Sequence, residues 1–267
     1  MLEDRIHKVK ETTSRMYESH FMNDALGDTF RPGGLNLTER LAELAGLNSD
    51  SFVLDIACGK GATKYFLSDK YGCRVVGIDL SAKLVSIAQK KSENDAPLSH
   101  VDLLVGDGEK LPFKDSTFDT VISECSISLL PDKRAAAREI ERVMKPKGKL
   151  VISDVILRSR ISSRLNNQIA FASCISGAES LNGYIKLFEN VGFGDTFVED
   201  HSEEMKRMGY QILVHFGSFE TFSKKLAEDS GIFETSCCGK RHRSPWLELF
   251  KEGKPGYALL SFTKPLP

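Results

Sequence analysis

Apolar and polar positions follow two different periods along the chain, and the change from one to the other predicts alternating helices and strands. The opening residues 2–22 show a mixed-charge helical pattern. Apolar residues spaced three or four apart predict a second helix over 37–47, LTERLAELAGL, which ends at Gly46. The continuous apolar run SFVLDIAC, residues 51–58, is typical of a strand that is covered on both faces.

The next hundred residues predict further strands and helices in regular alternation. The expected strands are RVVGIDL (74–80), VDLLVGD (101–107), TFDTVISEC (117–125) and GKLVISDVIL (148–157). The expected helices cover about 61–70, 81–91 and 132–145, with Ser81 as the N-cap of the second. This alternation predicts an α/β fold: a Rossmann-like, doubly wound sheet of about seven strands, mostly parallel, with helices on both faces.

After residue 158 the pattern is less regular. A sixth strand is expected over 195–201, a helical stretch over 203–231 and a last strand over 256–265. The polar segment 231–255 is expected to be a loop with one short helix. Helical elements are therefore added to the sheet at both its N-terminal and C-terminal sides.

Composition and charge disfavour several classes of function. The 267 residues are 41% hydrophobic and 27% charged, and the formal net charge of −1 provides no basic field for nucleic acid or membranes. No apolar run approaches the roughly 18 residues of a membrane span, and the N-terminus has no apolar signal segment. Six cysteines are too few for a disulfide scaffold, so we expect free thiols and a cytoplasmic location.

A pair of glycines follows the first strand, and an acid ends the second. Gly59 and Gly61, in DIACGKGA, permit a tight turn into a helix with no side chain above the crevice. Asp79 lies twenty residues beyond Gly59, where a carboxylate can accept hydrogen bonds from both ribose hydroxyls. Lys64 occupies a position at which a dinucleotide fingerprint requires a small residue, which disfavours a pyrophosphate ligand.

Other acids lie at the ends of the neighbouring strands. Asp107 ends the third strand, where it is placed to accept from an adenine amino group. Asp55 lies inside the first motif, near a position where a carboxylate can interact with an ammonium group or a helix N-terminus. Glu124 and Cys125 end the fourth strand. A single acid of this kind can simply cap the next helix, but four of them at one edge favour a ligand site.

The motifs VLDIACGKGA, GIDLS, GDGEKLPFKDSTFDTVIS and EIERVMKPKGKLVISD resemble those of class I S-adenosylmethionine-dependent methyltransferases. The resemblance covers about residues 51–157 and is strongest to the branch of ubiquinone-biosynthesis-type and arsenite methyltransferases (methyltransferase type 11). It implies methyl transfer with S-adenosyl-L-methionine as the cofactor. It also implies N-terminal helices that form a lid over 1–50, a cofactor-binding core over 51–157, and acceptor-side elements with the final strands over 158–267.

The same resemblance implies which residues bind each part of the cofactor. The methionyl part is assigned to Asp55 and Gly59, the ribose to Asp79, and the adenine to Asp107 and Gly108. The further cofactor positions expected in these motifs are Gly61, Leu80 and Glu124. Ala57 departs from the family pattern, which often has glycine there, and its methyl group narrows the loop.

Two cysteines are expected on the acceptor side of the crevice. The segments around Cys125 (SECSISLLPDK) and Cys174 (CISGA) resemble those that carry metalloid-binding cysteines in arsenite methyltransferases. In that family, thiolates would hold trivalent arsenic while its lone pair attacks the methyl group, and soft thiolates suit such a centre. Those enzymes also use a cysteine upstream of the glycine motif, which this chain lacks; Cys238, in the pair Cys237–Cys238, is a candidate third ligand.

Other functions stay open at this point. Cys125 and Cys174 can also pack beside a pocket for a small organic acceptor, with His201 as the general base. A third alternative is a non-catalytic thiol protein that binds a metal or metalloid, although retention of the strand-end aspartates disfavours it. The expected partner is a small-molecule or metalloid acceptor, with no nucleic acid and no membrane; the sequence makes no prediction of the oligomeric state.

Overall fold

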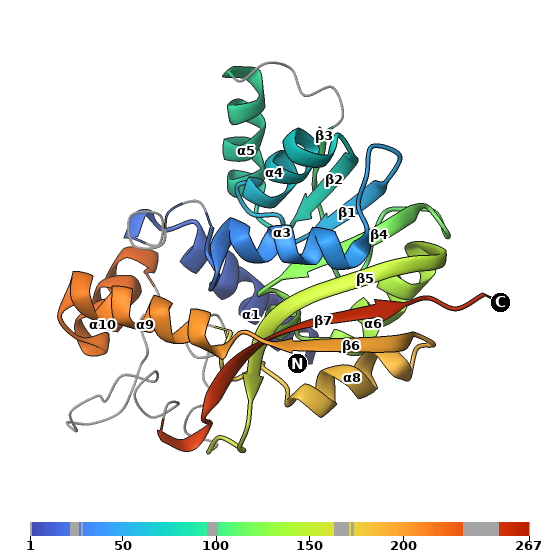
Figure 1. Ribbon diagram of the computed structural model, residues 1–267. Coiled ribbons are helices and arrows are strands. Elements are labelled where there is room, and N and C mark those ends of the chain that lie inside the picture. Colours follow the sequence, from blue (N-terminus) through green and yellow to red (C-terminus); the bar gives the residue numbers. More distant parts are fainter. Residues whose placement is uncertain are drawn as a thin grey trace.

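A twisted seven-stranded sheet forms the centre of the computed structural model, which describes residues 2–21, 27, 29–94, 101–162, 171, 174–231 and 251–266 (Figure 1). The strands are β1 (Phe52–Ile56), β2 (Arg74–Asp79), β3 (Val101–Val105), β4 (Phe118–Glu124), β5 (Met144–Leu157), β6 (Gly194–Asp200) and β7 (Pro255–Thr263). Their order is β3-β2-β1-β4-β5-β7-β6, with β1 to β5 parallel and β7 antiparallel to both of its neighbours. The predicted fold class is therefore confirmed.

Helices cover both faces of this sheet. The described helices are α1 (Leu2–Tyr17), α3 (Gly34–Ala45), α4 (Ala62–Tyr71), α5 (Ala82–Asn94), α6 (Lys133–Val143), α8 (Leu181–Glu189), α9 (Ser202–Phe216) and α10 (Phe219–Ser230). A short 3₁₀ turn, η1 (Ile127–Leu129), follows β4. Figure 1 shows α3 crossing one face of the sheet and α6 and α8 on the opposite face. α1, α9 and α10 meet beside the sheet through a shared apolar cluster that includes Met16, Ile212 and Phe222.

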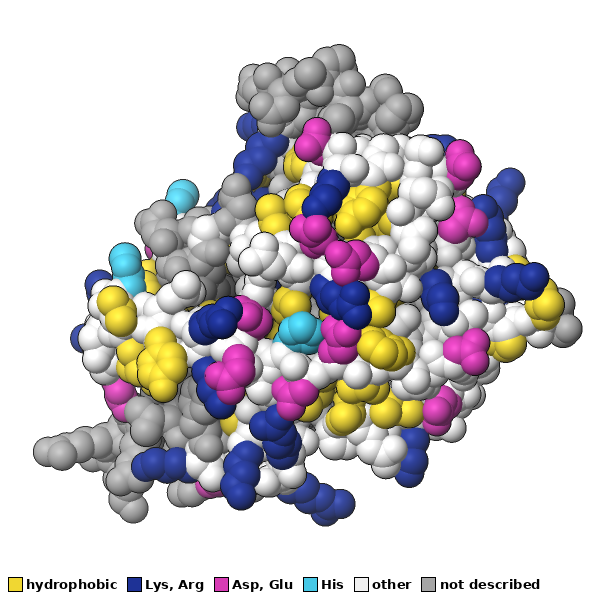
Figure 2. All heavy atoms as spheres, viewed as in Figure 1, with side chains coloured by type: hydrophobic (Ala, Val, Ile, Leu, Met, Phe, Trp, Pro, Cys, Tyr) yellow, Lys and Arg dark blue, Asp and Glu magenta, His cyan; other side chains and the backbone are white. Residues whose placement is uncertain are grey.

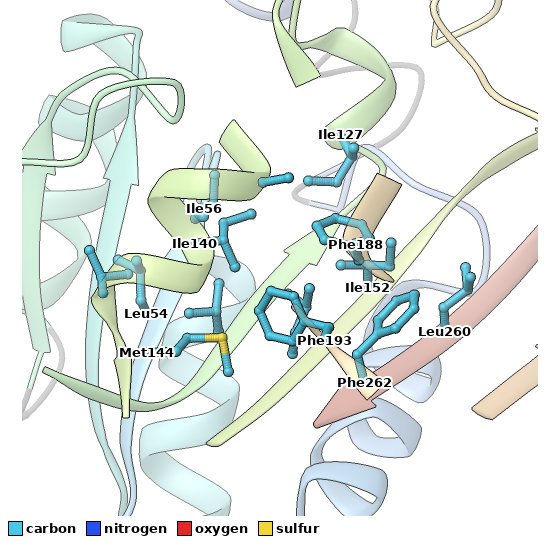
Figure 3. Close-up of a cluster of buried hydrophobic side chains, with 14 of the residues drawn as sticks. Leu54, Ile56, Ile127, Ile140, Met144, Ile152, Phe188, Phe193, Leu260 and Phe262 are labelled. Atoms are coloured by element: carbon cyan, nitrogen blue, oxygen red, sulfur yellow. The ribbon is translucent and has the colours of Figure 1, made fainter. Parts of the chain in front are cut away.

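Two apolar layers attach the helices to the sheet. On the α6 and α8 side, Phe188 and Phe262 lie with their ring centroids 5.1 Å apart, close to Met144 and Ile152 (Figure 3). On the other side, Leu41 of α3 and Leu67 of α4 belong to one cluster with β-strand residues such as Val53, Val75 and Val151. Because β1 is buried on both faces, its continuous apolar run is the pattern that such a strand requires.

Some helix boundaries differ from the predicted ones. α1 ends at Tyr17, whereas the helical pattern extended to residue 22. The predicted helical stretch 203–231 is two helices, because Gly217 adopts a positive φ of 74° and ends α9. Ser81 caps α5 as expected, since its Oγ accepts from the N–H of Leu84 at 3.1 Å.

The surface is mixed in charge on the face that Figure 2 shows, with Lys, Arg, Asp and Glu side chains interspersed. This agrees with a net charge close to zero. Among the described residues, no helix is both long enough and apolar enough to cross a bilayer. The predicted loop over 231–255 falls mostly on residues 232–250, outside the described residues, and so do Cys237 and Cys238. The division at residues 50 and 157 stays a prediction.

Candidate active site

A cleft opens where the carboxyl ends of β1 to β4 meet and the strand order reverses. This is the position at which open parallel sheets bind their ligands. Seven of the residues predicted to form the site line this cleft: Gly59, Asp79, Leu80, Asp107, Gly108, Glu124 and Cys125. Four other predicted residues, Asp55, Gly61, Cys174 and His201, are not among the residues that line it.

The Asp79 carboxylate is held in place by two backbone amides. Gly59 donates to one carboxylate oxygen and Ser81 to the other, each at 2.8 Å. Burial raises the pKa of Asp79, while these two hydrogen bonds oppose that rise. Gly59 has a positive φ of 52°, and a β-carbon placed on it would meet no atom within 4 Å. The glycine turn therefore leaves open space next to an oriented carboxylate, as a nucleoside ligand requires.

Asp107 is paired with a residue that sequence reasoning missed. The Lys10 ammonium of α1 donates to Asp107 at 2.7 Å and to Glu109 at 2.5 Å. Thr13 and Tyr17 of the same helix also line the cleft. α1 thus covers the cleft, and its position is fixed in part by the carboxylate predicted to contact adenine. No local pattern indicates this contact, because Lys10 and Asp107 are 97 residues apart in the chain.

Two buried titratable side chains, Asp55 and Lys64, lie beneath the glycine turn. Asp55 is 2% exposed, and one of its carboxylate oxygens has no hydrogen-bond partner among the described residues. Burial and the nearby Glu124 charge raise the pKa of Asp55 to about 8. Burial lowers the pKa of Lys64 to about 8. A β-carbon on Gly61 would lie 2.4 Å from Cε of Lys64, so this glycine makes room for the lysine below the turn.

Glu124 is the centre of a buried polar network. Nε of Arg31 lies 2.9 Å from one Glu124 oxygen, and the Thr63 hydroxyl donates to the other at 2.6 Å. Nη2 of Arg31 donates to the hydroxyls of Thr38 at 2.6 Å and Thr63 at 2.9 Å. The Arg31 and Glu124 side chains are 9% and 3% exposed, and both line the cleft. The network joins the start of α3 to the start of α4 and the end of β4.

The structure brings the two predicted acceptor-side thiols together. The sulfurs of Cys125 and Cys174 are 3.5 Å apart, and the Cys174 thiol also lies 3.2 Å from the Cys125 carbonyl oxygen. The Tyr17 hydroxyl is 3.5 Å from the Cys174 sulfur. Both cysteines have left-handed backbones, with φ of 55° and 61°, which non-glycine residues rarely adopt. Such conformations concentrate at functional sites, where the surrounding structure maintains them.

The environment of this thiol pair keeps Cys125 protonated. Its hydrogen bond with Cys174 and its burial raise the pKa of Cys125 well above the usual value. Two thiolates bound tetrahedrally to one soft ion at about 2.3 Å would be about 3.8 Å apart, close to the separation seen. Within the described part of the chain, no group of three or more His, Cys, Asp or Glu side chains is arranged to hold a metal.

His201 lies elsewhere, at the start of α9. Its Nε2 is 3.1 Å from Oε2 of Glu199, and the other carboxylate oxygen, Oε1, accepts from Nη2 of Arg40 at 2.6 Å. The imidazole therefore belongs to a polar cluster between β6 and α3, away from the cleft-lining residues. Its role as a base stays a prediction.

Residues 54–152 match the family model described as a methyltransferase domain. The chain is 25% identical to methyltransferase GfsG of Streptomyces halstedii over 256 residues, 95% of this chain and 88% of that protein. Its fold is similar to phosphoethanolamine N-methyltransferase 2 of Haemonchus contortus, solved with S-adenosyl-L-methionine, with a TM-score of 0.70 and 19% identity. That match covers 92% of this chain and 56% of the solved one.

This chain is an S-adenosylmethionine-dependent methyltransferase whose methyltransferase domain spans residues 54–152. Another relative of this methyltransferase is the arsenite methyltransferase of Aquipseudomonas alcaligenes, 32% identical over 158 residues. That alignment covers 55% of this chain and 46% of the relative. The cofactor is S-adenosylmethionine, and the three acids Asp79, Asp107 and Glu124 all line the cleft that would hold it.

Proposed function

We propose that this methyltransferase transfers the methyl group of S-adenosylmethionine to a thiophilic acceptor held by Cys125 and Cys174, with trivalent arsenic as the first candidate. The observation that carries the proposal is the 3.5 Å separation of the two sulfurs beside the cleft. Other cysteines of the described chain, such as Cys73, are buried without a thiol neighbour of this kind.

The position of Cys125 supports its assignment to the acceptor side. Cys125 follows Glu124 at the end of β4 and lines the cleft with Tyr17 and Leu129, whereas Asp79 and Asp107 lie at the β2 and β3 end. When bound, S-adenosylmethionine supplies an electrophilic methyl group. An acceptor on Cys125 would then approach from the end of the cleft opposite the adenosyl-binding aspartates.

Binding of such an acceptor has to remove the thiol protons. The raised pKa of Cys125 keeps this thiol neutral near pH 7, and a soft ion binds the thiolate form. Acceptor binding should therefore release protons and strengthen as the pH rises. The arsenite methyltransferase relative is consistent with this chemistry, although it aligns with only 55% of this chain. Cys238, the predicted third ligand, lies outside the described residues.

The direct test is methylation of arsenite with isotopically labelled S-adenosylmethionine. We expect labelled methylarsenical from the wild type and none from Cys125→Ser or Cys174→Ser. Cys73→Ser is the matched control, because the Cys73 thiol is buried beside Leu67 and does not line the cleft. Absence of product from the wild type, or equal yields from all three variants, would exclude the thiophilic acceptor.

The other two functions left open by the sequence have less support. A small organic acceptor with His201 as base requires that the imidazole reach the cleft, yet it is paired with Glu199. If arsenite gives no product, loss of turnover in His201→Ala with retained cofactor affinity would favour that alternative. A non-catalytic thiol protein is not supported, because the chain is a methyltransferase.

A further inference from the structure

We infer that Tyr17 and Tyr257 are positioning residues of the thiol site, and that their hydroxyls donate hydrogen bonds to the sulfurs of Cys174 and Cys125 when these sulfurs bind a soft ion. The inference deepens the proposed function and rests on it. It gives a role to two tyrosines, near opposite ends of the chain, that have no part in the cofactor assignments.

The Tyr17 hydroxyl approaches the thiol pair from the end of α1. It lies 3.5 Å from the Cys174 sulfur, and the Tyr17 ring packs edge-on against Phe30 with the ring centroids 5.6 Å apart. Tyr17 and Cys125 both line the cleft, so this contact borders the space that an acceptor would enter. Burial of the hydroxyl raises the pKa of Tyr17 well above its usual value, which keeps the hydroxyl protonated as a donor.

The Tyr257 hydroxyl reaches the pair from β7. Tyr257 is fully buried in the apolar cluster that also contains Cys125 and Cys174. Its hydroxyl is 3.0 Å from Oγ of Ser153 in β5, and the Ser153 carbonyl oxygen accepts from the N–H of Cys125 at 2.6 Å. When the Ser153 hydroxyl donates to Tyr257, the Tyr257 O–H is free to donate to the Cys125 sulfur. The contact with Cys174 and burial raise the pKa of Cys125, and the hydrogen bond from Tyr257 opposes that rise.

The charges around the pair explain why donors are needed. After its contact with Cys174 and its burial, the charge of the fully buried Asp154 is a further cause that raises the pKa of Cys125. Glu124 directly precedes Cys125, and Lys133 is a nearby cation whose charge interacts with Cys174. Thiolates beside carboxylates are unfavourable unless hydrogen-bond donors or a bound cation offset the negative charge. The two phenols provide such donors from both sides of the pair.

Cadmium binding measures the role of each phenol without any methyl transfer. Two S–H bonds break, two S–Cd bonds form and two protons pass to the buffer. Groups that hydrogen-bond to metal ligands contribute about ten- to hundredfold to metal affinity, so Tyr17→Phe and Tyr257→Phe should each weaken cadmium binding by about tenfold or more in calorimetry. The thiolate-to-cadmium absorption band should also move to longer wavelength, because a sulfur without its hydrogen bond holds its electrons less tightly.

Tyr184→Phe is the matched control. Tyr184 is also fully buried, but in the described part of the chain its hydroxyl is not hydrogen-bonded to either sulfur. We expect this variant to bind cadmium as the wild type does, with the same absorption band.

The outcomes separate the inference from the proposed function. Unchanged affinity in Tyr17→Phe and Tyr257→Phe, or weaker binding with an unshifted band, would overturn the inference and leave the two-thiol site intact. A wild type that binds no cadmium would overturn both. If cadmium behaves as expected but arsenite gives no product, the phenol contacts stand and arsenite is excluded as the methyl acceptor.

Discussion

Replacement of Asp79 by alanine should weaken cofactor binding while the protein stays folded. The carboxylate accepts two backbone N–H bonds at 2.8 Å, from Gly59 and Ser81, and these bonds orient it toward the cleft. Its predicted ligands are the two ribose hydroxyls. A hydrogen bond to a charged group contributes about 1.5–3 kcal/mol, so loss of two such bonds weakens binding by about 3–6 kcal/mol. The dissociation constant should therefore rise by about 10²- to 10⁴-fold.

Calorimetry with S-adenosylhomocysteine and 5′-methylthioadenosine measures this effect. Both ligands contain the ribose, so Asp79→Ala should weaken both by the same factor. Asp119→Ala is the control, because Asp119 also accepts a backbone N–H, from Phe52 at 3.0 Å, but does not line the cleft. An Asp79→Ala variant that is folded and binds both ligands as the wild type does would refute the reasoning.

Three further predictions concern the contacts of α1, the buried acid and the thiol pair. Lys10→Met removes the ion pairs with Asp107 and Glu109, so cofactor dissociation measured by stopped flow should accelerate about two- to fivefold. An unchanged rate would contradict a role of α1 in retaining the cofactor. The pKa of Asp55 is raised to about 8 in the folded protein. The protonated Asp55 carboxyl therefore contributes its full stability below about pH 4, and this contribution is lost as the pH rises toward 8. Urea denaturation should therefore show the wild type losing stability relative to Asp55→Asn over that range, and a constant difference would be inconsistent with the raised pKa. The pKa of Cys125 is raised first by its hydrogen bond with Cys174, so iodoacetamide should modify Cys125 slowly at neutral pH and faster in Cys174→Ala. Equal rates in both proteins would argue against the thiol contact.

The site residues that could be predicted from the sequence are those at the ends of strands. Asp79 and Glu124 are the last residues of their strands, and parallel strands bring their carboxyl ends to one edge. Residues of α1 carry no such signal. Lys10 contacts Asp107 across 97 positions, and only the folded chain brings α1 over the cleft.

The thiol pair was only partly predictable. The sequence placed Cys125 and Cys174 on the acceptor side, but their 3.5 Å contact depends on left-handed backbones at both residues. A positive φ is usually inferred from glycine, so no residue type indicates it here. In the fold, the position of β7 between β5 and β6 was likewise hidden, because the apolar pattern of a strand does not specify its neighbours.

A crystal structure with S-adenosylhomocysteine is the most direct test of the assignments made for the cleft. We predict the ribose hydroxyls on Asp79, the adenine beside Asp107, and the sulfur facing Cys125. A nucleoside bound away from the carboxyl ends of β1 to β4, or a ribose that makes no contact with Asp79, would contradict the account.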